Sequence, residues 1–246
     1  MRHLVIGSMH ALQGIFGREE RSFESFAVQK GTGALAAFLG NEGCIPLVSL
    51  KTRQSVGTLK MSGAARCAAF TGDGLGLWSL GTDGVLHQWD LRMRRCVARV
   101  ADEGATNSTG LAYTDEGGGW LATGSDMGVV NLYRPSGLVS SASVAAGPLA
   151  AAPGTPAKAL LNLTTTIDTL AFSPDGQMLA MASRMKRDSL RLVHLPSCTV
   201  FANWPTSKTP LGHVHSVAFS PGGGFMAIGN AKGRALLYRM HHYTTA

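Results

Sequence analysis

The sequence of 246 residues contains no apolar run that approaches the ~18 to 20 residues of a membrane-spanning helix. Its first apolar stretch breaks at Gly7 and Ser8, short of the ~7 to 15 residues that form the core of a secretory signal peptide. The four cysteines are scattered singly, without the C-x-x-C pair of a zinc site and without the spacing of a disulfide framework. We therefore expect an intracellular protein with reduced thiols and no membrane association.

Residue patterns typical of catalysis are missing as well. There is no G-x-S-x-G, and the glycine-rich stretch at residues 72–76 lacks the Lys-Ser/Thr of a phosphate-binding loop. The triplet His213-Val214-His215 would place two imidazoles on one face of a strand, but it has no Cys or acidic partner beside it. Adjacent acidic pairs such as Glu19-Glu20 point apart in a strand or loop. We expect no enzyme activity, no cofactor, no metal site and no small-molecule substrate.

A short pattern recurs five times along the chain: a strand, a turn containing Ser or Thr and Gly, a second strand, a tight turn and a third strand. One residue precedes each third strand, and these markers are Gly43, Gly84, Gly128, Asp188 and Gly233. They are separated by 41, 44, 60 and 45 residues. Three of these steps match the ~40 to 45 residues of a WD40 propeller blade. The pattern therefore predicts an all-β fold, a WD40-type β-propeller with about five blades.

The expected propeller region is a single unit over residues 1–246, with blades near 22–53, 62–96, 108–134, 158–198 and 212–240. The long step between the third and fourth markers coincides with residues 135–157, which are almost entirely Ala, Ser, Gly, Pro and Val. This segment lacks the apolar periodicity of a strand or helix. We expect it to be an exposed, low-complexity insertion between two blades.

Tight turns are expected where Asp or Asn stands one or two residues before Gly, because Gly has no Cβ and the other two tolerate the left-handed backbone region. Three residues occupy such positions: Asn41, Asp83 and Asp126. The Trp89-Asp90 dipeptide matches the signature of WD repeats and falls in register with Tyr133 and Tyr238 of other repeats. We expect the dipeptide and the turn residues to have structural roles.

Positive charge is concentrated in the last third of the chain. Residues 158–246 hold nine Lys and Arg against three Asp, a balance of +6 out of the total of +7. A polyanionic partner such as nucleic acid would explain this charge, and a mildly basic solvated surface would explain it equally well. Arg184, Lys186 and Arg187 fall on the expected hairpin between the second and third strands of the fourth repeat. We expect these cations to contact RNA phosphate or an acidic neighbouring protein, with a merely solvated turn as the alternative.

Beyond the blade pattern, residues 190–205 and 213–243 resemble the C-terminal propeller portion of the U3 small nucleolar RNA-associated protein 18 family. Further matches are Lys60-Met61-Ser62-Gly63, the Trp89-Asp90 blade and Asp102-Glu103-Gly104. The stretch that ends in His241-His242-Tyr243 is not part of the WD consensus, so it makes the match specific. The resemblance extends over the chain apart from the insertion at residues 135–157.

Members of this family are WD-repeat components of the small-subunit processome, in the UTP-B group. The resemblance implies a non-catalytic scaffold of the nucleus and nucleolus that acts in pre-rRNA processing and 18S rRNA maturation. The implied partners are other WD-repeat proteins of the processome, the U3 small nucleolar ribonucleoprotein and pre-ribosomal RNA, bound directly or indirectly. The resemblance also implies an N-terminal extension and further blades before Met1, so we expect the five blades not to close an independent ring.

A second interpretation stays open from the sequence alone. The blade pattern is equally compatible with a WD-repeat adaptor in an unrelated complex, for example a ubiquitin ligase or a chromatin assembly. Co-purification with the U3 small nucleolar RNA would separate the two.

Overall fold

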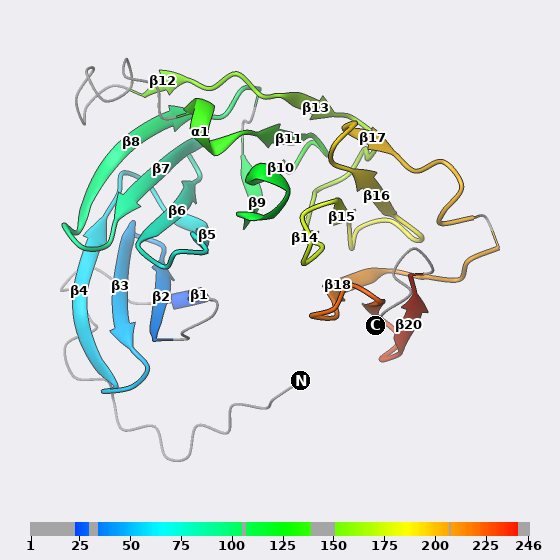
Figure 1. The fold of residues 1–246 in the computed structure, drawn as a ribbon, viewed down its shortest axis with the longest axis horizontal. Helices are drawn as coiled ribbons and strands as arrows, with labels where there is room; N and C mark the ends of the chain where they lie inside the picture. Colours follow the sequence, from blue (N-terminus) through cyan, green and yellow to red (C-terminus); the bar gives the residue numbers. More distant parts are fainter. Residues whose placement is uncertain (1–22, 30–33, 105–106, 139–150, 207, 241–246) are drawn as a thin grey trace.

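The structure, a computed structural model, describes residues 23–29, 34–104, 107–138, 151–206 and 208–240. In these ranges the chain is nearly all β, and its five sheets follow one another along an arc (Figure 1). The described sheets do not close into a ring, and Figure 1 shows the opening between the first sheet and the fifth. The expected all-β arrangement of about five propeller blades is confirmed, including its open form.

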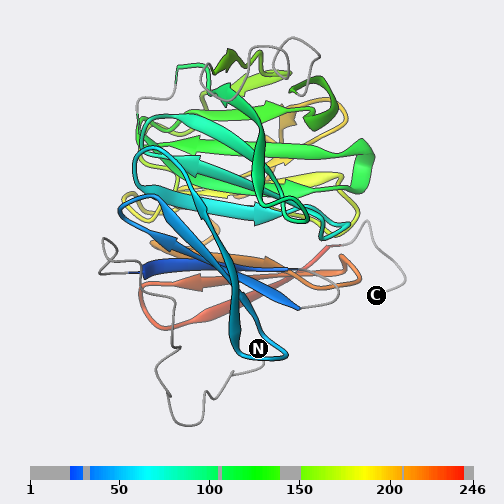
Figure 2. The ribbon, with the colours of Figure 1, turned by 90° about the vertical axis from the view of Figure 1, so that its left-hand side faces the viewer.

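The first two sheets have the same order of antiparallel strands. The first contains β1 (Phe23–Val28), β2 (Leu35–Gly40), β3 (Cys44–Ser49) and β4 (Gln54–Lys60). The second contains β5 (Ala65–Phe70), β6 (Gly76–Gly81), β7 (Val85–Asp90) and β8 (Arg95–Ala101), with a further strand β12 (Ala152–Pro153) at its outer edge. Figure 2 looks onto these two sheets, blue and cyan to teal, packed against each other. The blade boundaries expected at residues 53 and 96 leave out β4 and most of β8. β4 is largely exposed and polar, so it has no apolar pattern that the sequence could reveal.

The third sheet contains β9 (Ser108–Thr114), β10 (Trp120–Ser125), β11 (Val130–Tyr133) and β13 (Lys158–Leu160), with the 3₁₀ turn η1 (Glu116–Gly118) before β10 and α1 (Pro135–Leu138) after β11. β13 pairs with β11, with Lys158 opposite Leu132. Residues 135–157 therefore lie within the third blade and not between blades, and residues 158–160 belong to the third blade and not to the fourth. Both corrections have one cause: the outer strand of this blade is only three residues long and has no periodicity to detect.

The insertion is also anchored at its ends, contrary to the expected exposed loop. β12 pairs in parallel with β8, with Ala152 opposite Val100, and the Gly154 N–H donates to the Ala101 carbonyl at 3.0 Å. Leu138 is buried at the other end. An outer strand offers unpaired backbone groups, so two residues can dock on it without any apolar pattern. Residues 139–150, in the middle of the insertion, lie outside the described residues.

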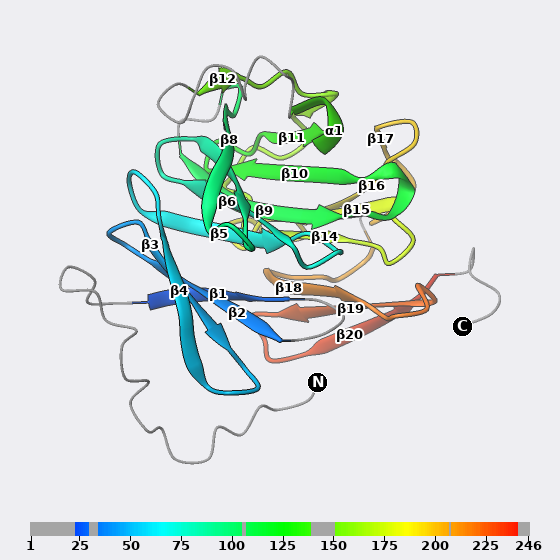
Figure 3. The ribbon, with the colours of Figure 1, turned by 60° about the vertical axis from the view of Figure 1, so that its left-hand side comes forward.

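The last two sheets complete the arc. The fourth contains β14 (Thr169–Phe172), β15 (Met178–Ala182), β16 (Leu190–His194) and β17 (Thr199–Val200), and the fifth contains β18 (Val214–Phe219), β19 (Phe225–Asn230) and β20 (Ala235–Arg239). β18 lies next to β14, the inner strand of the fourth sheet (Figure 3).

The same turn joins the first and second strands of three sheets. Thr71, Ser173 and Ser220 each use the side-chain oxygen to accept a backbone N–H from the residue five positions later, at 2.9, 2.9 and 3.0 Å. Their own N–H groups donate to the carbonyl of that same residue. The hydroxyl thus satisfies a backbone donor that the turn would otherwise leave open. This is why the pattern repeats in the sequence.

The tight turns between second and third strands follow the sequence prediction. All five markers have a left-handed backbone, with φ of 76° at Gly43, 68° at Gly84, 84° at Gly128, 55° at Asp188 and 71° at Gly233. Glycine adopts this region without a steric penalty, and aspartate is among the residues that tolerate it. The periodic spacing of the markers therefore reflects one backbone geometry, repeated in each sheet.

Buried residues form four clusters, each between two consecutive sheets. Representative pairs are Ile45 with Leu77, Trp78 with Leu121, Leu132 with Leu179, and Leu190 with Val214. Central strands such as β6, β10 and β15 are buried on both faces, as expected for stacked blades. Within the described ranges no cluster joins the fifth sheet to the first. Each sheet is stabilised by its neighbours along the arc.

Candidate functional site

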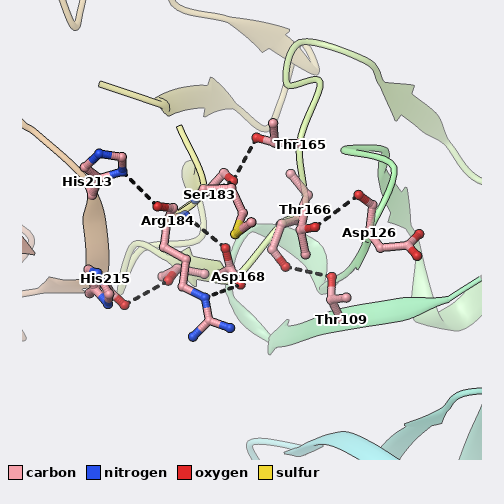
Figure 4. Close-up of polar contacts among 12 residues, drawn as sticks. Thr109, Asp126, Thr165, Thr166, Asp168, Ser183, Arg184, His213 and His215 are labelled. Atoms are coloured by element: carbon pink, nitrogen blue, oxygen red, sulfur yellow. Dashed lines mark hydrogen bonds and ion pairs between the residues drawn. The ribbon is translucent and has the colours of Figure 1, made fainter. Parts of the chain in front are cut away.

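The cations singled out from the sequence lie on the turn between β15 and β16, at residues 183–189. Arg184, Lys186 and Arg187 are all exposed, and Met185 between them is 64% exposed. Figure 4 shows the start of this turn among polar residues that come from the third, fourth and fifth sheets. The turn is therefore accessible and stands beside the fifth sheet.

Two contacts hold the start of the turn. Asp168, just before β14, accepts the backbone N–H of Arg184 through Oδ2 at 2.9 Å, and its Oδ1 lies 3.1 Å from Arg184 Nε (Figure 4). His213 donates its Nδ1–H to the Arg184 carbonyl at 3.0 Å. The Arg184 side chain is 59% exposed but that of Asp168 only 15%, so the carboxylate is the sheltered half of the ion pair. Arg184 is held in place by its neighbours and is not a free cation.

The end of the turn is fixed by a reciprocal pair of hydrogen bonds. The Asp188 N–H donates to the Gly212 carbonyl at 2.8 Å, and the Gly212 N–H donates to Asp188 Oδ1 at 2.7 Å. Asp188 is the only one of the five marker positions that is not glycine. Its carboxylate supplies an acceptor to the segment before β18, which glycine could not do.

Between these anchors, Lys186 and Arg187 have no ion-pair partner in the described part of the chain. The turn thus presents two unpaired cations beside one that is paired. Sequence reasoning found the three cations but missed the contacts of Arg184 with Asp168 and His213, which are 16 and 29 residues away. No local pattern connects residues at such separations, so only the fold reveals the contacts.

Threonine hydroxyls tie the segment before β14 to the sheets on either side. Thr109 of β9 donates to the Ile167 carbonyl at 2.7 Å, and Thr166 donates to the Asp126 carbonyl at 3.2 Å (Figure 4). Thr165 bonds the Ser183 hydroxyl at 2.8 Å. Asp126 occupies the predicted turn between β10 and β11, and its buried Oδ1 has no hydrogen-bond partner within the described ranges. These bonds hold the segment that carries Asp168, and Thr165 joins it to Ser183 at the start of the cationic turn.

The WD dipeptide has the contacts of a structural element. Trp89 donates its indole N–H to the Ser79 hydroxyl at 2.8 Å, inside the second sheet. Asp90 accepts the backbone N–H groups of Arg92 and Met93 at 2.8 and 3.0 Å. The side chain of the predicted turn residue Asp83 likewise accepts a backbone N–H, that of Val85, at 3.2 Å. All three side chains bond within their own blade and stabilise turns or strands.

The described residues hold no group of three His, Cys, Asp or Glu side chains that could bind a metal ion. No helix in the described ranges is long and apolar enough to cross a membrane. Burial raises the pKa of the Cys67 thiol to about 11, so this thiol is protonated at neutral pH. The acidic pair Glu19-Glu20 and the stretch His241-His242-Tyr243, both named in the sequence analysis, lie outside the described residues. The chemistry offered by the cationic turn is charge and hydrogen bonding, which suits a binding surface.

No family model matches the chain. Among curated proteins, it is 44% identical over 232 residues to the U3 small nucleolar RNA-associated protein 18 homolog of Arabidopsis thaliana, which covers 94% of the chain. It is 35% identical over 242 residues, 98% of the chain, to the homolog of Homo sapiens. A shorter match, 56% identical over 124 residues, half of the chain, is with U3 small nucleolar RNA-associated protein 18 of Saccharomyces cerevisiae.

The chain belongs to the U3 small nucleolar RNA-associated protein 18 family. Relatives that carry this name come from plants, animals and fungi, and the resemblance found in the sequence is confirmed. The chain spans 40% of the length of the Arabidopsis protein, 41% of the human one and 19% of the yeast one.

Proposed function

We propose that this member of the U3 small nucleolar RNA-associated protein 18 family is a non-catalytic scaffold in ribosome biogenesis. It acts in the small-subunit processome of the nucleolus, in pre-rRNA processing and 18S rRNA maturation. Its partners are the U3 small nucleolar ribonucleoprotein, pre-ribosomal RNA and other WD-repeat proteins. The observation that carries the proposal is the shared name of relatives that match 94% and 98% of the chain. The described surface adds cationic turns on a rigid β framework, which suit an RNA-associated scaffold.

The test is recovery of RNA with the tagged chain from nuclear extract of the organism that encodes it. We expect the U3 small nucleolar RNA and pre-rRNA to be enriched by sequencing over other small nucleolar RNAs, which serve as the internal control. An untagged strain measures the background. Recovery of ubiquitin-ligase or chromatin proteins without U3 RNA would contradict the proposal and favour the adaptor alternative.

We further propose that the turn at residues 183–189 contacts RNA phosphate or an acidic neighbouring protein through Lys186 and Arg187, with Arg184 beside them. Replacing all three by Glu would confuse two effects, since Arg184→Glu would set a second carboxylate against Asp168. The sharper variant is Lys186→Glu with Arg187→Glu, which keeps the ion pair. Exposed substitutions of this kind change stability by less than about 0.5 kcal/mol.

The matched control is Lys232→Glu with Arg234→Glu. These two exposed cations lie on the corresponding turn of the fifth sheet, between β19 and β20. We expect the Lys186/Arg187 variant to crosslink less to pre-ribosomal RNA, or to lose one neighbouring protein, while the control keeps both. If both variants incorporate into pre-ribosomal particles and crosslink as the parent does, the 183–189 turn is merely solvated.

A further inference from the structure

A second group of cations lies on the opposite half of the arc, on the turns that join the third and fourth strands of the first two sheets. Residues 49–54 carry Lys51 and Arg53, and residues 90–95 carry Arg92, Arg94 and Arg95. All five side chains are exposed, and none has an ion-pair partner within the described ranges. We refer to these five residues as the basic ridge.

The two turns have the same backbone. Arg53 and Arg94 occupy equivalent positions, just before the fourth strand, and both are left-handed, with φ of 58° and 53°. The equivalent residue of the fourth sheet is Cys198, with φ of 51°. Because these turns join corresponding strands, they lie on the same side of the arc. The turn geometry is thus common to three sheets and does not require arginine.

In the described ranges, no side-chain hydrogen bond or ion pair requires arginine at positions 53 and 94. The left-handed region is sterically unfavourable for an ordinary side chain, and Gly or Asn would avoid most of that cost. The corresponding turn of the fourth sheet, residues 194–199, contains no Lys or Arg at all. Arg134, after β11 of the third sheet, is used inside its own blade, with its guanidinium 3.5 Å from the centre of the Trp120 ring. Among the described turns of this type, unpaired positive charge is therefore found on the first two sheets.

The two turns form one surface. A Cβ at Gly57 of β4 would lie 3.0 Å from Arg94 Cδ, so the Arg94 side chain crosses the outer strand of the neighbouring sheet. Figure 1 shows β4 and β8 following one another along the outer edge of the arc. Asp90 is the only acidic residue in these two turns, and its Oδ1 accepts the backbone N–H groups of Arg92 and Met93. The ridge thus keeps a net charge of +4 over two adjacent turns.

We propose that the basic ridge binds the phosphate backbone of RNA without reading its sequence. Four of the five cations are arginine, whose planar guanidinium matches phosphate oxygens in pairs. Neither turn contains an aromatic side chain on which a base could stack, so affinity comes from phosphate contacts alone. The inference rests on the proposed RNA association of this family member and adds to it a direct contact and its location.

The test is fluorescence anisotropy of a labelled oligouridylate of about 16 nucleotides, the upper range of a single-strand site, with the purified chain. The ridge variant combines Lys51→Gln, Arg53→Asn, Arg92→Gln, Arg94→Asn and Arg95→Gln; asparagine suits the left-handed positions, so folding should be retained. A control variant removes five exposed cations elsewhere by Gln substitution, at Lys158, Lys208, Lys232, Arg234 and Arg239. Both variants lose the same net charge, and their melting temperatures are compared with that of the parent.

We expect the ridge variant to bind about tenfold more weakly or worse, and the slope of log K against log[salt] to fall by about 0.7 for each lost phosphate contact. The control variant should stay much closer to the parent in both quantities. Equal losses in the two variants, or parental affinity in the ridge variant, would overturn the proposal. The proposal would also fail if the ridge variant lost binding to polyglutamate but kept binding to RNA, because the ridge would then bind an acidic protein.

Recovery of U3 RNA from cells separates this inference from the proposed function. If the ridge variant loses oligouridylate binding but still recovers U3 RNA, the ridge binds RNA and the assembly is held by proteins. If the parent recovers no U3 RNA while the ridge result stands, the proposed function fails and the ridge remains supported.

Discussion

Removing the phenolic hydroxyl of Tyr133 should destabilise the junction of the second and third sheets. The Tyr133 hydroxyl donates to Asp102 Oδ1 at 2.5 Å, and Asn131 Nδ2 donates to the same oxygen at 2.8 Å. All three side chains are buried, with Asp102 only 7% exposed. Burial and the Asp102 carboxylate raise the pKa of Tyr133, which therefore remains a protonated donor. In Tyr133→Phe, the buried carboxylate would lose one of its two side-chain donors.

The expected cost follows from the charge of the acceptor. A hydrogen bond to a charged group contributes about 1.5 to 3 kcal/mol, and a buried group left short of partners keeps its desolvation penalty. Since a chain of this size loses about 2 to 4 °C of melting temperature per kcal/mol, the variant should melt about 3 to 12 °C below the parent. The backbone N–H of Glu103, which also bonds the Tyr133 oxygen, belongs to an exposed residue and can turn to water.

Tyr113→Phe is the matched control. Its hydroxyl also bonds a carboxylate, that of Asp115, but Asp115 is exposed and water can replace the donor. Removing that bond should cost about 0.5 kcal/mol or less. Thermal and urea unfolding of the parent, the two Phe variants, Asp102→Asn and the double variant Tyr133→Phe/Asp102→Asn would also give the coupling energy between Tyr133 and Asp102. If the two Phe variants were equally stable, the buried carboxylate would not depend on Tyr133 and the reasoning would be refuted.

Two further predictions concern a histidine and the anchored insertion. Burial, and to a smaller extent the charge of Arg99, holds the pKa of His87 below its ordinary value. As pH falls below about 6.5, the histidine is therefore protonated in the unfolded chain before it is protonated in the folded one. The free energy of unfolding should decrease over this range. His87→Gln should remove that part of the loss in urea unfolding at acidic pH; an unchanged pH slope would contradict this. At Gly154 a Cβ would lie 2.6 Å from Val100 Cγ1, so Gly154→Ala should lower stability by about 1 to 3 kcal/mol. Gly137→Ala is the control, because a Cβ at Gly137 would have no other atom of the described residues within 4 Å. If Gly154→Ala and Gly137→Ala melted at the same temperature, the docking of β12 would not contribute to stability.

The sequence predicted the repeated part of the fold because each repeat uses the same local chemistry. Glycine or aspartate at the five markers, and the hydroxyls of Thr71, Ser173 and Ser220, satisfy backbone groups within a few residues. Interactions of such short range leave a pattern in the sequence that spacing alone can detect. The inner three strands of each blade were therefore found, and with them the number of sheets and the positions of the WD dipeptide and of Asp83 and Asp126.

The outer strands and the base of the cationic turn could not be predicted in this way. β4 is polar and mostly exposed, β13 has three residues and β12 has two, so none has a detectable period. The contact of Arg184 with Asp168 joins segments from different strands, and neither residue is unusual in its own surroundings. The features that the sequence did not reveal are all short or polar elements, and their partners are determined by how the sheets stack.

The cations proposed to bind a partner and the acidic residues that hold their turns are different side chains. The cations can therefore be substituted without unfolding the protein. At the 183–189 turn, Asp168 and Asp188 hold the backbone, while Lys186 and Arg187 make no ion pair in the described part of the chain. On the basic ridge, Asp90 likewise holds the backbone of the turn that carries Arg92 and Arg94, by accepting two of its N–H groups. In both places an acidic side chain fixes the loop through backbone N–H groups, so the neighbouring cations are left to solvent or to a partner. Substituting the cations should therefore change binding and leave stability nearly constant, whereas substituting the acidic residues should change both.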